Sequence, residues 1–207
     1  VVLVGIIGVF VFFWLISAGK LGFMPTFEEL ENPNNRFASE VYFADGPIMN
    51  RYFEKENRKY IEYREIPQSV IDALIATEDV RFYDHSGVDV RGLFRVAKGL
   101  LTANTSAGGG STISQQLAKM LFPRESDLNV FELAIRKFRE WVIAVRLEKS
   151  YTKEEILTMY LNKYDFLNLA VGISSAADIY FQVPLDSLKV EQAAMLIGMA
   201  KNSSYYN

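Results

Sequence analysis

The sequence contains no cysteine and a single histidine, His85, among its 207 residues. Without cysteine there is neither a disulfide framework nor a thiolate zinc site, and one histidine cannot form a multi-histidine metal site. The net charge is -3 at pH 7, so the overall charge gives no support to nucleic-acid binding. No internal repeat is present, and residues 22–207 are long enough for one ordinary domain with a real core.

Charged residues are absent from the first 19 positions, and the first charge is Lys20. A helix needs roughly 20 apolar residues to cross the hydrocarbon core, whereas the apolar region of a secretory signal usually has about 7 to 15. Trp14 and Lys20 are typical of an interfacial boundary. We therefore expect residues 1–19 to form a transmembrane anchor; a cleaved signal that ends at residues 17–19 is the alternative.

The next segment, residues 20–66, is expected to be a juxtamembrane linker with a small hairpin. Two extended runs, residues 38–43 and 48–53, are rich in aromatic and branched side chains. They flank Asp45-Gly46, a pair that favours a hairpin turn.

Residues 67–207 have a mainly helical pattern. Three capping-box patterns mark expected helix starts, namely Thr112 with Gln115, Asn129 with Glu132, and Thr152 with Glu155. Residues 90–101 carry an apolar stripe with basic residues on the opposite side. The part of this stripe at residues 93–101 has two interpretations, packing in the core or contact with the membrane interface.

Glu78 stands at the end of an apolar helical run. Val70, Ile71, Leu74 and Ile75 recur at helical intervals, and Glu78 follows Leu74 by four residues, so it falls on the buried-facing stripe. A carboxylate beside apolar surface loses hydration, which favours its protonated form and suits it to proton transfer. The alternative is a helix-end acid satisfied by a nearby arginine.

A second acid, Glu140, follows Arg136 by four residues and Lys137 by three. Both cations can therefore lie beside the carboxylate on one face of a helix. The alternative is a cluster that only stabilises the helix, since such pairs contribute about 0.2 to 0.5 kcal/mol each. Lys119, which follows Gln115-Gln116, is equally open between a site residue and a solvated lysine.

The order of these elements resembles the peptidoglycan glycosyltransferase family, the polymerising domain of class A penicillin-binding proteins and of monofunctional transglycosylases. Residues 78–87 fit the family pattern E-D-x-x-F-x-x-H-x-G, and residues 109–116 fit G-x-S-T-I-x-Q-Q. Residues 136–140 fit R-K-x-x-E, and residues 153–162 fit K-x-x-I-L-x-x-Y-L-N. The resemblance covers residues 41–207.

The resemblance implies a mainly α, lysozyme-like glycosyltransferase domain with a small N-terminal β-hairpin and one N-terminal transmembrane helix. The implied reaction polymerises lipid II: the growing glycan on its lipid pyrophosphate is the donor, and an incoming lipid II supplies a sugar 4-hydroxyl. Glu78 is expected to be the general base of this inverting transfer, and Glu140 to orient cations or a metal on the donor side. The leaving pyrophosphate is expected to be stabilised by Lys119, Arg136 and Lys137.

The remaining implied site residues bind substrate or support the turn after Glu78. Those expected to position the substrate by hydrogen bonds are Ser111, Gln115 and Gln116. Those expected to support the turn are Asp79, Phe82, His85 and Gly87. No cofactor is required; Mg²⁺ or Mn²⁺ is compatible with pyrophosphate departure, although the sequence contains no dedicated ligand set.

The implied partners are lipid II, the nascent glycan strand, the lipid bilayer and other cell-wall synthesis proteins, with no nucleic acid. The implied location is the bacterial cytoplasmic (inner) membrane, with a single pass and the catalytic domain on the outer face. Leu167 stands where relatives usually carry a glycine, which changes the expected backbone of that loop. A fifth family motif would lie beyond Asn207, so the domain is expected to be truncated at its C-terminus.

Two other functions are left open by the sequence. One is a catalytically silent scaffold domain that binds lipid II, and the other is a lysozyme-like enzyme that cleaves glycan. Intact Glu78 and Glu140 argue against the silent scaffold domain. The motif at residues 109–116, together with the acidic pair, argues against the glycan-cleaving enzyme.

Overall fold

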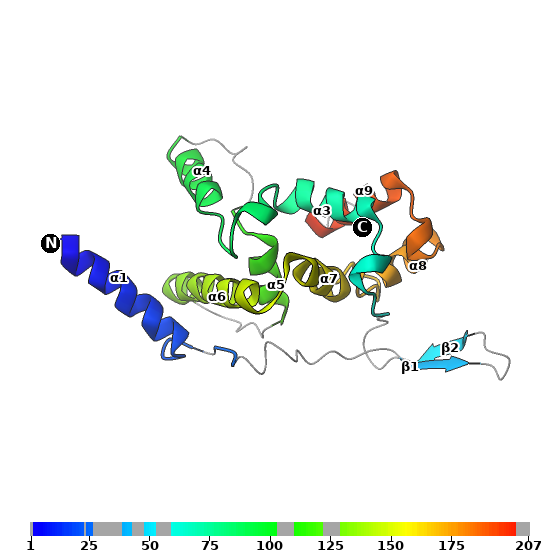
Figure 1. The fold of residues 1–207 in the computed structure, drawn as a ribbon, viewed down its shortest axis with the longest axis horizontal. Helices are drawn as coiled ribbons and strands as arrows, with labels where there is room; N and C mark the ends of the chain where they lie inside the picture. Colours follow the sequence, from blue (N-terminus) through cyan, green and yellow to red (C-terminus); the bar gives the residue numbers. More distant parts are fainter. Residues whose placement is uncertain are drawn as a thin grey trace. The chain divides into compact units, whose positions relative to one another are not determined.

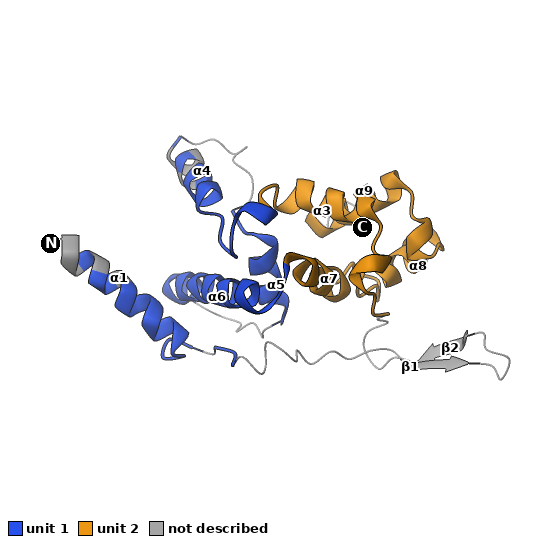
Figure 2. Ribbon diagram, in the orientation of Figure 1, with its two compact units in different colours: residues 1–33, 83–152 blue, residues 34–82, 153–207 orange. Residues whose placement is uncertain are grey.

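The computed structural model describes residues 2–22, 24–26, 39–42, 48–52, 59–102, 110–121 and 129–201. Helices make up most of the described chain (Figure 1), so the prediction of a mainly α fold is confirmed. The chain forms two compact units, each built from separate stretches of sequence (Figure 2). Unit 1 contains Val1–Pro33 and Tyr83–Thr152, and unit 2 contains Asn34–Phe82 and Lys153–Asn207.

The described part of unit 1 contains helices α1 (Val2–Ser17), α4 (Val90–Leu101), α5 (Ile113–Leu121) and α6 (Val130–Ser150). The predicted capping box at the start of α6 is confirmed. Asn129 Oδ1 accepts a hydrogen bond from the Glu132 amide at 2.9 Å, and Glu132 Oε2 accepts one from the Asn129 amide at 2.8 Å. Helices α5 and α6 pack against each other, and both contribute fully buried apolar side chains to the core of this unit.

Helix α1 also packs against α6. The ring of Phe12 meets that of Phe138 edge-on, with centroids 5.3 Å apart, and Arg146 donates to the carbonyl oxygen of Ser17 at 2.8 Å. Helix α1 contains 16 of the 19 residues that were predicted to form the anchor. Within the described ranges, no helix combines the length and the apolar character needed to cross a membrane.

Helix α4 tests the two interpretations of the apolar stripe at residues 90–101. Val90 is 58% exposed and Phe94 is 73% exposed, so these side chains do not pack in the core. Arg91 and Arg95 are exposed as well. The core-packing interpretation is therefore wrong for Phe94, whose side chain is left uncovered.

The described part of unit 2 contains helices α3 (Gln68–Glu78), α7 (Lys153–Lys163), α8 (Ile173–Phe181) and α9 (Val190–Lys201), with short 3-10 turns η1 (Tyr63–Glu65) and η4 (Leu185–Ser187). Helices α3 and α9 lie side by side (Figure 1). Their buried leucines, Leu74 and Leu196, belong to the core of this unit. A third 3-10 turn, η2 (Phe82–Asp84), carries the chain from unit 2 into unit 1.

Strands β1 (Ser39–Tyr42) and β2 (Ile48–Tyr52) pair in antiparallel fashion, with an irregularity between Val41 and Tyr42. They lie within the two extended runs predicted from the sequence. The predicted turn at Asp45-Gly46 lies outside the described residues.

Candidate active site

Glu78 is the last residue of α3. The helix buries Val70, Ile71 and Leu74, the stripe expected from their spacing. The Oε1 atom of Glu78 is buried as well, which agrees with the position of this residue on the same stripe. The fold of α3 therefore holds the carboxyl group at the edge of the core of unit 2.

The turn after Glu78 is held by two buried residues. Asp79 is 7% exposed, and its carbonyl oxygen accepts a hydrogen bond from the Phe82 amide at 2.9 Å. Phe82 is fully buried, and the ammonium of Lys153 lies 4.2 Å from the centre of its ring. Lys153 opens the fourth motif, so this cation–π contact joins the first and fourth motifs. Sequence reasoning missed this role of Lys153, for which only its place in the motif gave a signal.

Two tyrosines of unit 2 lie near Glu78. Tyr160 and Tyr164 stack with ring centroids 5.7 Å apart. Burial, and next the negative charge of Glu78, raise the pKa of both phenols above their ordinary value. The Glu78 carboxylate therefore acts electrostatically on both phenols. Tyr160 belongs to the fourth motif, but no sequence pattern singled out Tyr164.

Gly87 closes the first motif and lies in unit 1. Its φ is +93°, and a Cβ atom there would approach the carbonyl carbon and oxygen of Ala144 to 2.8 Å. Any larger residue would therefore collide with the backbone of α6 while adopting a conformation that favours glycine. His85 Nδ1 accepts a hydrogen bond from the Gly87 amide at 3.2 Å, a contact expected of a histidine that supports the turn.

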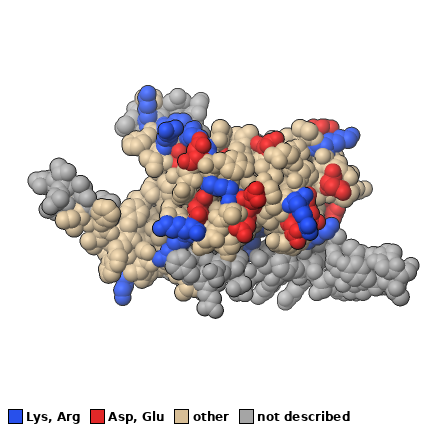
Figure 3. Space-filling view, in the orientation of Figure 1, with Lys and Arg blue, Asp and Glu red and all other residues tan. Residues whose placement is uncertain are grey.

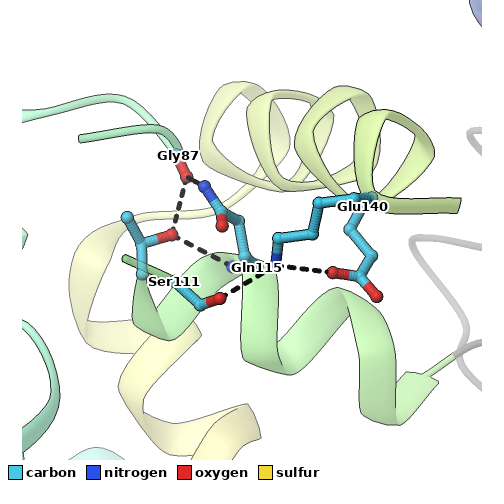
Figure 4. A network of polar contacts seen from close by, with 6 residues as sticks. Gly87, Ser111, Gln115 and Glu140 are labelled. Atoms are coloured by element: carbon cyan, nitrogen blue, oxygen red, sulfur yellow. Dashed lines mark hydrogen bonds and ion pairs between the residues drawn. The ribbon is translucent and has the colours of Figure 1, made fainter. Parts of the chain in front are cut away.

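The carbonyl oxygen of Gly87 accepts two hydrogen bonds from the second motif (Figure 4). Thr112 Oγ1 donates at 2.7 Å and Gln115 Nε2 at 3.3 Å. Thr112 Oγ1 also accepts from the Gln115 amide at 3.2 Å, so the first half of the predicted capping box is formed. The Gln115 side chain, which would complete the box, bonds to Gly87 instead.

Gln115 was predicted to position the substrate. It is only 1% exposed, and its amide nitrogen is engaged by Gly87. Its Oε1 is buried and has no hydrogen-bond partner among the described residues, so the amide retains an unused acceptor. The main visible contact of Gln115 is thus within the protein, and its role toward substrate stays a prediction.

Lys137 joins the second and third motifs. Its ammonium donates to Ser111 Oγ at 2.8 Å and to Glu140 Oε2 at 2.8 Å (Figure 4). Glu140 is 9% exposed, so its charge is taken out of water but paired. The predicted carboxylate–cation cluster is therefore formed by Lys137. Among the described residues, Glu140 forms its ion pair with Lys137, and the expected role of Arg136 toward the leaving group stays a prediction.

The other predicted residues of unit 1 lie on α5, where Gln116 is half-buried and Lys119 is exposed. The site residues thus form two sets. Unit 2 contains Glu78, Asp79 and Phe82, and unit 1 contains His85, Gly87, Ser111, Gln115, Gln116, Lys119, Arg136, Lys137 and Glu140. Across the described ranges, no group of three histidine, aspartate or glutamate side chains could hold a metal ion.

Comparison with known proteins identifies the family of the chain. The family model described as transglycosylase matches residues 45–207. The chain is 37% identical to penicillin-binding protein 1A of Escherichia coli (strain K12) over 184 residues, which are 89% of this chain and 21% of that protein. It is 38% identical to penicillin-binding protein 1A of Pseudomonas aeruginosa over 184 residues, 89% of this chain and 22% of the relative. The chain thus spans about a fifth of the length of these relatives. The chain belongs to the transglycosylase family, as its four ordered motifs predicted.

Proposed function

We propose that the chain is a membrane-anchored peptidoglycan glycosyltransferase that polymerises lipid II into glycan strands. The observation that carries this proposal is the ammonium of Lys137, held between Ser111 and the buried Glu140 within a chain of the transglycosylase family. A fixed cation is the group that a reaction with a pyrophosphate leaving group requires.

On the acceptor side, Glu78 is the general base. It removes the proton from the 4-hydroxyl as that oxygen attacks the anomeric carbon of the donor, and the bond from that carbon to the lipid pyrophosphate breaks. The attack comes from the face opposite the leaving group, so configuration inverts. The place of Glu78 at the end of α3, with its Oε1 buried, supports this role.

On the donor side, the leaving pyrophosphate gains negative charge as the glycosidic bond breaks. Lys137 stabilises that charge, and its two hydrogen bonds keep the ammonium in place before the reaction begins. Glu140 orients Lys137 and does not act as a nucleophile. Arg136 and Lys119 add positive charge from α6 and α5. Among the described residues, no group of three or more acidic or histidine side chains forms a ligand set for Mg²⁺ or Mn²⁺.

Unit 1 attaches the protein to the bacterial cytoplasmic membrane, with a single pass and the catalytic residues on the outer face. Helix α1 leaves large apolar side chains uncovered, with Phe10 73% and Trp14 64% exposed. Its sequence contains no charged residue, and Figure 3 draws its described part in tan, the colour of uncharged residues. Its 16 residues extend about 24 Å, and the uncharged Ala18 and Gly19 lengthen the apolar segment.

Helix α4 supports the same attachment. It combines the exposed Val90 and Phe94 with basic residues, as membrane-surface helices do. The partners that follow from this location are lipid II, the nascent glycan strand and other proteins of cell-wall synthesis.

The test is to reconstitute the protein in membranes, add labelled lipid II and resolve the products by length, with Glu78→Gln in parallel. Glycan chains that are absent in the variant support the proposal. Lipid II binding without chains would favour a silent scaffold domain instead. Shortening of preformed glycan would favour a lysozyme-like cleaving enzyme.

A further inference from the structure

The loop between α7 and α8 contains three consecutive residues in the left-handed region of backbone conformation. Leu167, Asn168 and Leu169 have φ of +67°, +49° and +67°. None of them is glycine, and branched or bulky residues rarely adopt such angles. A run of this kind persists only where surrounding contacts fix it, and such strain gathers at functional sites.

Local hydrogen bonds close this turn. The Phe166 amide donates to the carbonyl oxygen of Ala170 at 2.8 Å, and the Ala170 amide donates to that of Leu167 at 2.8 Å. Asp165 Oδ1 accepts from the Leu167 amide at 2.8 Å. These contacts lie within the loop itself, so they cannot by themselves fix it to the rest of unit 2.

Tyr180 supplies a contact from outside the loop. Its hydroxyl, carried by α8, donates to the carbonyl oxygen of Phe166 at 2.7 Å and accepts from Asn168 Nδ2 at 3.1 Å. One hydroxyl thus both donates and accepts across the strained residues. Phe166 is 1% exposed, so the loss of its partner would leave a carbonyl group unsatisfied near the core.

The closed loop positions Tyr164. The Gly172 amide donates to the carbonyl oxygen of Tyr164 at 2.8 Å, and the ring of Phe166 meets that of Tyr164 with centroids 4.9 Å apart. The Tyr164 hydroxyl donates to the carbonyl oxygen of Ala200 in α9 at 2.7 Å. Its ring stacks on Tyr160. Tyr164 is therefore held from the loop, from α7 and from α9.

Helix α9 links this tyrosine to the end of α3, the helix that carries Glu78. The negative charge of Glu78 is among the causes that raise the pKa of Tyr164, after burial and ahead of the neighbouring Asp165. Helix α9 reaches the same place, because Lys201 Nζ donates to the carbonyl oxygen of Thr77 at 3.1 Å. Helix α9 therefore contacts both Tyr164 and the residue that precedes Glu78.

We infer that Tyr180 is a positioning residue for the acceptor-side site. Its hydroxyl keeps the turn at Leu167, Asn168 and Leu169 closed, and the closed turn holds Tyr164 beside Glu78. The inference rests on the proposed role of Glu78 as the base. Tyr180 acts through the loop and touches no substrate.

The experiment uses Tyr180→Phe in the full chain, reconstituted in membranes, with kcat and KM for lipid II measured together. We expect kcat to fall about tenfold with little change in KM, since a displacement of the base costs rate without removing substrate contacts. Tyr60→Phe, at an exposed tyrosine of the same unit, is the control and is expected to keep full kcat.

A rescue separates this mechanism from a general loss of packing. Adding Leu167→Gly to Tyr180→Phe lets the backbone adopt a positive φ without steric cost, so kcat is expected to recover most of its loss. Hydrogen exchange of the Ala170 amide, which bonds to Leu167, is expected to quicken in Tyr180→Phe and slow again in the double variant. Should Tyr180→Phe fail to fold, Asn168→Ala removes one of the two hydroxyl contacts and is measured in the same way.

Full kcat in Tyr180→Phe, or a folded double variant without recovery, would overturn the inference. Glu78→Gln is measured beside these variants. If Glu78→Gln remains active, the proposed base is wrong, whereas hydrogen exchange at Ala170 still reports whether Tyr180 closes the turn. The two failures are therefore distinguishable.

Discussion

Replacement of Gly87 by alanine is the change for which the structure gives the clearest magnitude. The added Cβ would lie 2.8 Å from the carbonyl carbon and oxygen of Ala144 and from the amide nitrogen of Val145, all backbone atoms of α6. Relief of such overlap costs about 1 to 3 kcal/mol. The φ of +93° adds about 1 to 2 kcal/mol for a residue with a side chain. We therefore expect Gly87→Ala to lower the free energy of unfolding by about 2 to 5 kcal/mol.

The change would also move the Gly87 carbonyl away from Thr112 and Gln115, so polymerisation should weaken along with stability. The assay is denaturant unfolding in detergent micelles, followed by circular dichroism. Gly8→Ala is the matched control: apart from its chain neighbours and the backbone of its own helix, no atom lies within 4 Å of its added Cβ, so its effect should stay within about 1 kcal/mol. An equal, small effect of both substitutions would refute the reasoning.

Three further predictions concern other contacts. Asn162→Ala should lower the free energy of unfolding by about 2 to 4 kcal/mol, measured by denaturant unfolding, because its side chain bonds both the amide and the carbonyl of Ile61, at 2.9 and 2.8 Å. Above pH 10 the unfolded chain releases the Tyr160 proton while the folded chain keeps it, since burial and Glu78 raise this pKa. Stability should therefore fall with rising pH by up to about 1.4 kcal/mol per pH unit more than in Tyr160→Phe, measured by unfolding at several alkaline pH values. Lys137→Met should slow polymerisation by about 100-fold or more, whereas Lys119→Met, at an exposed lysine, should cost less in the same lipid II assay.

Periodic and local features could be predicted from the sequence. The buried stripe of α3 and the place of Glu78 on it follow from helical spacing alone. The capping box at Asn129 and Glu132 is equally local, since it joins residues three apart. The pairing of Lys137 with Glu140 is local as well.

Contacts between distant segments could not be predicted in this way. The Gln115 side chain lies 28 positions from Gly87, and only the packing of α5 and α6 brings the two together. This contact competes with the capping box that the local pattern predicted, and it prevails where the helix end is buried. Arg136 has the same spacing advantage as Lys137, yet the helix places only Lys137 between Glu140 and Ser111.

The conformation of Leu167 could be predicted only in part from the sequence. Its departure from the family pattern marked the loop as unusual, and the structure gives it a φ of +67°. The sequence contained no sign that Asn168 and Leu169 share the left-handed region, or that Tyr180 holds them there. The hydrogen bonds that hold these residues form only once α8 has packed.

If Glu78 is the base in glycan synthesis, its replacement must slow the formation of the first glycosidic bond. The measurement is a single-turnover reaction with labelled lipid II on the unmodified protein and on Glu78→Gln, with lipid II binding measured on both. We expect Glu78→Gln to form this bond at least about 100-fold more slowly than the unmodified protein, while it binds lipid II almost as tightly. If the variant forms the bond at nearly the normal rate, Glu78 is not the general base.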